Sequence, residues 1–204
     1  MNDNISFMTK YEAKTFSIGE LEGISKDQIN QHLGLYSGYV KNVNGLQDDL
    51  AMYMEDSQKH ARALSELMRR FGFEFNGMRL HEYYFEQLGE SGVSSASGES
   101  GELKAAIVEQ FGSFEAWENQ FKAIGKMRGI GWVLLVRDEL HGNLHNIWVS
   151  DHELGHLGGQ DILCAMDVWE HAYMVDHGAK GRGDYIDAFF ANLNWGVCEA
   201  RFCL

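Results

Sequence analysis

The sequence predicts an α+β fold, in which an N-terminal helical hairpin is followed by a small three-stranded antiparallel sheet with helices. Apolar residues recur at helical spacing through the first half of the chain. A β-hairpin pattern with a Gly-Asn turn follows in the second half. The small, polar segment 91–100 separates the two patterns. We therefore expect an N-terminal helical hairpin domain at residues 1–92 and a C-terminal α/β domain at residues 93–204.

The first half is expected to form three helices, because its apolar residues recur three and four positions apart. Ser25 and Gln28 have the spacing of a capping box, which marks the start of the first helix. The other two helices are expected over residues 47–70 and 76–88, where the same spacing continues.

The second half is expected to combine helices with three strands. Ser113 is a candidate cap for the second of its helices, and the turn at Gly142-Asn143 joins the first two strands. In chain order, the expected elements are helices 102–111 and 113–126, strands 131–137, 144–149 and 162–168, and a closing helix 184–202.

Composition narrows the class of function. The chain has 204 residues and a formal net charge of −13, so we expect neither a nucleic-acid partner nor an anionic membrane partner. Its longest apolar run, IGWVLLV, is too short to span a bilayer. The opening MNDNISFMTK lacks the apolar stretch of a secretory signal, and the three cysteines suit a reducing compartment. We therefore expect a cytoplasmic protein.

The segment His152-Glu153-Leu154-Gly155-His156 matches the zinc-peptidase pattern H-E-x-x-H letter for letter. In that pattern two histidines on one helix face bind zinc, and the glutamate is the general base. A catalytic zinc needs a third protein ligand, and the longer motif's third histidine falls on Ile162. The nearby glycines also disfavour a helix. A zinc peptidase is therefore kept as an alternative.

A second group of residues has the chemistry of a different metal site. His32 and His81 each lie on the apolar face of an expected helix. Asp167 precedes His171 by four residues in an apolar, aromatic stretch. One histidine on such a face is usually a hydrogen-bonded core residue, but the four residues together are harder to explain in that way. Three imidazoles and one carboxylate suit iron or manganese better than structural zinc.

The segment DVWEHAY resembles the signature of one known family, the iron/manganese superoxide dismutases. The resemblance runs along nearly the whole chain. Its other segments are LEGISKDQINQHLGLYSGYVKNVNGL, NGMRLHEYYFEQL, FGSFEAWENQFKAIGKMRGIGWVLLV and DYIDAFFANLNW.

This resemblance implies that His32, His81, Asp167 and His171 bind one iron or manganese ion per subunit, with water or hydroxide in a fifth position. It implies the dismutation of superoxide to dioxygen and hydrogen peroxide, with the metal alternating between its 3+ and 2+ states. The ion would lie between the two domains, each of which supplies two ligands. The ligand set does not choose between iron and manganese.

The resemblance also assigns roles around the metal. Tyr39 matches the gateway tyrosine, although it follows His32 at a separation of seven where the family usually has eight. Trp132 and Trp169 match the aromatic wall of the site. His152 falls where the family often has a glutamine, and some members a histidine, that hydrogen-bonds the metal-bound solvent. The match to the peptidase pattern would then be a coincidence.

Three further positions concern assembly and activity. Glu170 matches a glutamate that reaches across a dimer interface to the last ligand histidine of the partner, which implies a homodimer or a tetramer. Tyr36 replaces the family's outer histidine four residues after the first ligand, and Met174 replaces the tyrosine that pairs with it. This missing pair leaves a second alternative open, a relative that keeps the fold and the metal without catalytic activity.

Overall fold

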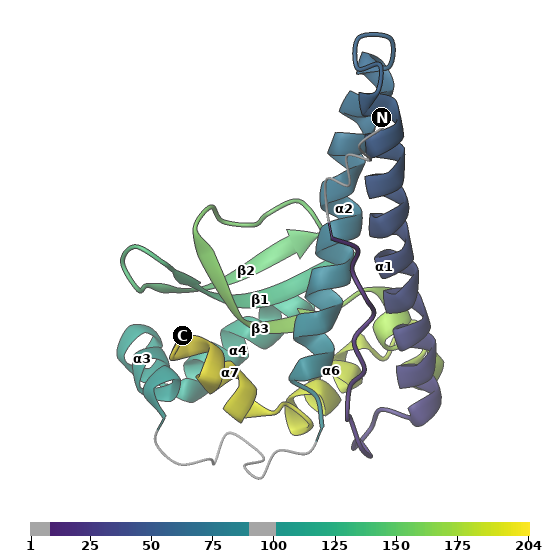
Figure 1. The fold of residues 1–204 in the computed structure, drawn as a ribbon. Helices are drawn as coiled ribbons and strands as arrows, with labels where there is room; N and C mark the ends of the chain where they lie inside the picture. The colour runs from purple at the N-terminus through teal and green to yellow at the C-terminus, as the bar shows by residue number, and fades with distance from the viewer. Residues whose placement is uncertain (1–8, 90–100) are drawn as a thin grey trace.

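The computed structural model describes residues 9–89 and 101–204 (Figure 1). Two long antiparallel helices form a hairpin beside a three-stranded sheet, and the later helices gather around the sheet. In chain order the elements are α1 (Lys26–Met54), α2 (Ala61–Glu86), α3 (Glu102–Phe111), α4 (Phe114–Gly125), β1 (Gly131–Asp138), β2 (Leu144–Ser150), β3 (Gln160–Asp167), η1 (Glu170–Ala172), α5 (Met174–His177), α6 (Arg182–Ala191) and α7 (Trp195–Phe202).

Within residues 9–89 the chain forms two helices, so the prediction of three over residues 26–88 was wrong. The expected cap is present, because the Ser25 hydroxyl oxygen accepts the Gln28 N–H at 3.1 Å. The buried stripe of α1 then continues in phase through Val43, Gln47 and Leu50. Burial of this stripe outweighs the poor helix propensity of Gly45, which lies between the first two expected helices. The chain reverses instead between α1 and α2, after Met54.

The sheet has the strand order β2-β1-β3, and both pairings are antiparallel. The three predicted strands and the two helices before them are confirmed within a few residues, including the Ser113 cap, which accepts the Ala116 N–H at 3.0 Å. The central strand β1 is buried from Gly131 to Val136. Its register pairs Trp132 with the last residue of β3, Asp167. This pairing puts a tryptophan beside one of the expected metal ligands.

The closing segment is two helices, so the prediction of a single helix over 184–202 was wrong. The chain leaves α6 at Asn192, whose side chain bonds the backbone of Glu22. Asn194 then caps α7 by accepting the Val197 N–H at 3.3 Å. Asparagine side chains favour such caps over helix interiors, so the two asparagines explain the break.

The arrangement of the elements brings three parts of the chain together at one place. The hairpin helix α1 contacts α2, η1 and α5, and α2 contacts β3. Figure 1 shows the lower part of the hairpin lying against the sheet and the segments that follow it. Within residues 9–89 and 101–204, no helix is long and apolar enough to cross a membrane. The expected linker and domain boundary at 92/93 fall outside the described residues.

Candidate metal centre

Four side chains from three parts of the chain converge in the interior. His32 comes from α1, His81 from α2, Asp167 from the end of β3 and His171 from η1. Their ligand atoms all lie within 4.8 Å of one another, and this is the single such group of histidine, cysteine and acidic residues in the described part of the chain. His32, His81 and Asp167 are fully buried, and the His171 side chain is 19% exposed. The structure thus brings together all four residues expected to bind metal.

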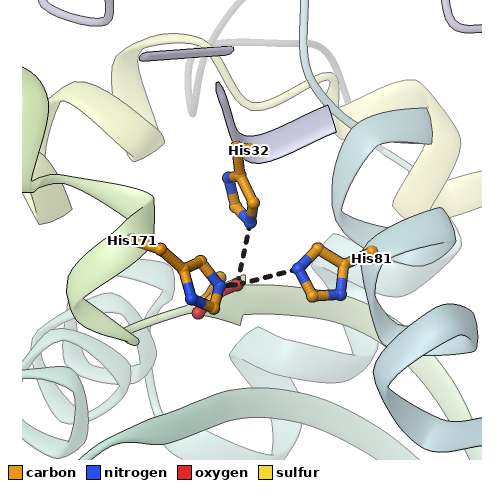
Figure 2. A group of neighbouring side chains, drawn as sticks. His32, His81 and His171 are labelled. Atoms are coloured by element: carbon orange, nitrogen blue, oxygen red, sulfur yellow. Dashed lines mark hydrogen bonds and ion pairs between the residues drawn. The ribbon is translucent and has the colours of Figure 1, made fainter. Parts of the chain in front are cut away.

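Hydrogen bonds hold both the carboxylate and the backbone of Asp167. The Trp169 N–H donates to its Oδ1 atom at 2.8 Å, and the Tyr185 hydroxyl donates to its backbone carbonyl at 2.7 Å. The other oxygen, Oδ2, lies 3.1 Å from the Nε2 atoms of both His32 and His171. Figure 2 shows the three imidazoles pointing toward this one oxygen.

The donor atoms are spaced as the ligands of one metal ion would be. Bonds of about 2.1 Å to nitrogen and oxygen place neighbouring ligand atoms about 3.0 Å apart at right angles and about 3.6 Å apart at about 120°. In this structure, Asp167 Oδ2 lies 3.1 Å from His32 Nε2, 3.1 Å from His171 Nε2 and 3.6 Å from His81 Nε2. The four side chains therefore fit a single transition-metal ion.

The tautomer of His81 gives an independent test of this fit. Its Nδ1 lies 2.5 Å from the Gly77 carbonyl oxygen, which can only accept, so Nδ1 carries the proton. The Nε2 lone pair then faces the cluster, where it is buried and has no hydrogen-bond donor among the described residues. A buried acceptor without a donor is costly in a protein interior. A bound cation at this position would satisfy it.

Electrostatics favour the protonation states that bind metal. Burial lowers the pKa of His32 and of His81, so both imidazoles stay neutral. Burial alone would raise the pKa of Asp167, but His171 and His32 beside it hold that pKa well below its ordinary value. The carboxylate is therefore ionised and ready to bind a cation.

The peptidase-like segment lies in a turn after β2, not on a helix. Asp151 and Gly155 both have positive φ, at 51° and 118°, which no helix allows. His156 Nε2 lies 3.1 Å from the His152 carbonyl oxygen, and its Nδ1 accepts from the Gln160 amide at 2.9 Å. The two histidines thus share no metal-binding face, and the peptidase arrangement is not formed.

His152 connects two of the expected site residues. The Trp132 indole N–H donates to His152 Nδ1 at 2.9 Å, and His152 Nε2 lies 2.7 Å from the Tyr39 hydroxyl oxygen. An indole can only donate, so Nδ1 is the acceptor and the ring proton sits on Nε2, facing Tyr39. Burial lowers the pKa of His152 to about 4 and raises that of Tyr39. The imidazole is therefore neutral, and the hydroxyl proton of Tyr39 stays free for another acceptor.

Comparison with known proteins identifies the family to which this chain belongs. Residues 99–201 match the family model described as iron/manganese superoxide dismutases, C-terminal domain. A superoxide dismutase [Fe] of Cupriavidus metallidurans is 38% identical over 94% of this chain and 96% of its own. The chain belongs to the iron/manganese superoxide dismutase family. It is also similar to a superoxide dismutase [Fe] of Aquifex pyrophilus, 39% identical over 89% of this chain and 85% of that protein.

Relatives of both metal types are similar to this chain. Superoxide dismutase [Mn] 2 of Haloferax volcanii is 34% identical over 82% of this chain and 80% of its own length. The relatives similar to this chain thus include superoxide dismutases named for iron and others named for manganese. This agrees with a ligand set that suits both metals.

Two tryptophans and Glu170, which the family resemblance also singled out, lie near the cluster. Trp169 stacks on His171 at 5.5 Å between ring centroids and on His152 at 4.8 Å. Trp132 packs edge-on against His81 at 5.1 Å. Glu170 is exposed on η1. The two tryptophans thus pack against two histidines of the cluster.

Tyr36 is buried beside the cluster, but its hydroxyl is turned away from it. The hydroxyl donates to the buried Glu82 carboxylate at 3.1 Å and accepts the Lys14 N–H at 2.9 Å. Glu82 is also paired with Arg79 at 2.5 Å. In this chain the position that carries a histidine in much of the family therefore fastens the N-terminal segment to the hairpin.

One buried polar residue near the site escaped the sequence analysis. Gln28 is 1% exposed and was interpreted only as half of a capping box. Its side chain instead donates to the His171 carbonyl at 2.6 Å and accepts the Val175 N–H at 3.0 Å. The available signal was its position four residues before His32, which puts a polar side chain on the buried stripe of α1.

Proposed function

We propose that this chain is a superoxide dismutase that holds one iron or manganese ion per subunit with His32, His81, Asp167 and His171. The observation that carries the proposal is the convergence of three imidazole nitrogens on one ionised carboxylate oxygen, at distances of 3.1 to 3.6 Å. The buried, unpaired Nε2 of His81 supports it. When bound, the ion supplies reversible one-electron chemistry between its 3+ and 2+ states.

The charge of the ligands suits an anionic substrate. Asp167 contributes one negative charge, while His32 and His81 are neutral. A divalent or trivalent cation in this set leaves a net positive charge at the centre, which attracts superoxide in an otherwise acidic protein. Dismutation of two superoxide anions consumes two protons and yields dioxygen and hydrogen peroxide, so the site also needs a proton donor.

We assign the role of proton donor to Tyr39. His152 supports this role through its hydrogen bond to the Tyr39 hydroxyl. The Nε2–H of His152 donates to the Tyr39 oxygen, which leaves the Tyr39 proton available to substrate or solvent. Burial raises the pKa of Tyr39, so the hydroxyl remains protonated at neutral pH. Trp132 fixes the tautomer that this arrangement requires. The expected bond from His152 to a metal-bound solvent stays a prediction.

We also propose that the chain acts as a homodimer or tetramer. His171 is the least buried ligand, and Glu170 lies exposed next to it. Met174 and Val175, which follow on the same segment, are 40% and 42% exposed despite being apolar. If a second copy covered this surface, Glu170 of one subunit could reach the last ligand histidine of the other, as the family resemblance implies. The N-terminal domain, 1–92, and the C-terminal domain, 93–204, would supply two ligands each.

The cytoplasm is the location that we propose for this enzyme. Its three cysteines, Cys164, Cys198 and Cys203, are free thiols, which suits a reducing compartment. The formal net charge of −13 supports the absence of nucleic-acid and anionic-membrane partners.

A pair of substitutions separates this proposal from the peptidase alternative. Asp167→Asn keeps the shape of the ligand and removes its charge, so we expect bound iron or manganese and superoxide removal to fall by more than about tenfold. Glu153→Gln should leave both unchanged, because Glu153 lies in a turn outside the cluster. The reverse pattern would favour the peptidase. A wild-type protein that holds the metal but removes no superoxide would favour the inactive relative.

A further inference from the structure

The amide of Gln28 lies between two backbone groups that would otherwise bond each other. It donates to the carbonyl of His171 at 2.6 Å and accepts the N–H of Val175 at 3.0 Å. These two groups are four residues apart, and in a continuous α-helix the N–H of the later residue bonds the carbonyl of the earlier one. Gln28 therefore takes the place of one helical hydrogen bond.

The inserted amide coincides with a break in the helix. The ligand His171 lies in the 3-10 turn η1, and α5 begins only at Met174. Tyr173 between them has φ −142° and ψ −12°, outside the helical region. The first N–H groups of α5 lack partners within the helix, and Gln28 satisfies one of them.

Gln28 is also tied to the other half of the site. It lies on the buried stripe of α1, one turn before the ligand His32. It is 1% exposed, so losing either hydrogen bond would leave a buried backbone group unpaired. Its amide thus fixes the backbone of one ligand residue from the helix that carries another.

We infer that Gln28 is a positioning residue for His171, and that its amide holds the junction between η1 and α5 open so that this imidazole faces the metal. The inference rests on the proposed function. Without the amide, the His171 carbonyl and the Val175 N–H would bond each other, which would lengthen α5 toward η1 and turn the imidazole away from Asp167.

Other contacts between the same two segments provide controls. The Asp176 carboxylate accepts the Ser25 N–H at 2.6 Å, so it also fastens the start of α1 to α5, but on the exposed side. Gln31 lies on α1 as well, where its exposed amide donates only to Asp27 at 3.1 Å in the described structure. Asp176→Asn tests whether weakening any contact between α1 and α5 has the same effect. Gln31→Met tests the effect of replacing a glutamine by methionine elsewhere on α1.

The test compares Gln28→Met with these controls in iron-loaded protein. We expect about tenfold weaker iron binding, at the low end for loss of an outer partner of a ligand, and a changed ferric electron paramagnetic resonance spectrum. Gln31→Met and Asp176→Asn should keep the wild-type affinity and spectrum. If Gln28→Met does not fold, Gln28→Glu replaces it, because its carboxylate still accepts the Val175 N–H but repels the His171 carbonyl.

Two results would overturn the inference. One is a folded Gln28 variant with wild-type iron affinity and spectrum, even if its thermal stability falls. The other is an equal change in Asp176→Asn, which would show that any contact between α1 and α5 has this effect and that Gln28 does not position His171 specifically. Wild-type protein measured in parallel keeps the two claims apart, since failure of the wild type to remove superoxide contradicts the proposed function. Wild-type activity with an unchanged Gln28 variant contradicts only this inference.

Discussion

Gly77 leaves the space that the ring of Tyr39 occupies. A β-carbon at Gly77 would lie 2.6 Å from Cδ1 and 2.7 Å from Cε1 of that ring, closer than real contacts allow. The carbonyl of the same glycine accepts the Nδ1 proton of His81. One residue without a side chain therefore sets both the tautomer of His81 and the place of the Tyr39 ring.

Gly77→Ala should displace Tyr39 and break its contact with His152. We expect a loss of about 1–3 kcal/mol in the free energy of unfolding from overpacking, and a lower superoxide turnover per bound metal. Gly72→Ala on the same helix is the matched control, because a β-carbon there would meet no described atom within 4 Å. It should gain about 0.5–1 kcal/mol from helix propensity. Equal turnover in the two variants would show that Tyr39 does not need this space.

Substitutions at His152 test the chain of contacts from Trp132 to Tyr39. Glutamine can accept from the indole and donate to the phenol, so His152→Gln should retain most of the turnover. His152→Leu removes both contacts and leaves the Trp132 N–H buried without a partner, which costs about 1–3 kcal/mol of unfolding free energy. Stopped-flow decay of superoxide and denaturant unfolding measure the two effects. Wild-type turnover in the leucine variant would rule out a role for this connection.

Tyr36→Phe should affect stability and spare catalysis. It removes the hydroxyl that bonds Glu82 and Lys14, leaving a buried carboxylate short of one donor. We expect a loss of about 1–3 kcal/mol in unfolding free energy. Turnover per bound metal should stay unchanged, because the hydroxyl faces away from the cluster. A large loss of turnover in a metal-replete variant would show instead that the Tyr36 hydroxyl acts at the site.

The four candidate metal ligands were predictable because their chemistry is unusual for their surroundings. His32 and His81 are polar residues on apolar helix faces, and the segment that holds Asp167 and His171 is a family signature. All four meet within 4.8 Å. The strands were likewise predictable, because the short apolar runs of the first and third and the Gly-Asn turn between the first two are local signals.

What the sequence did not reveal depends on contacts between distant segments. Gln28 fits a local capping pattern, but its side chain bonds a segment more than 140 residues away. Tyr36 occupies an inward position, yet its hydroxyl direction is decided by Glu82 and Lys14. The helix predicted over 47–70 was broken by a turn that no glycine or proline marks. Local patterns carry none of this information.

The most direct test of the account is superoxide removal per bound metal atom, on protein loaded separately with iron and with manganese. We predict rapid removal with at least one metal, at one ion per chain, and the active metal identifies the cofactor. Activity with both would identify an enzyme that accepts either ion. A folded protein that holds one ion per chain and removes no superoxide with either metal would contradict the account.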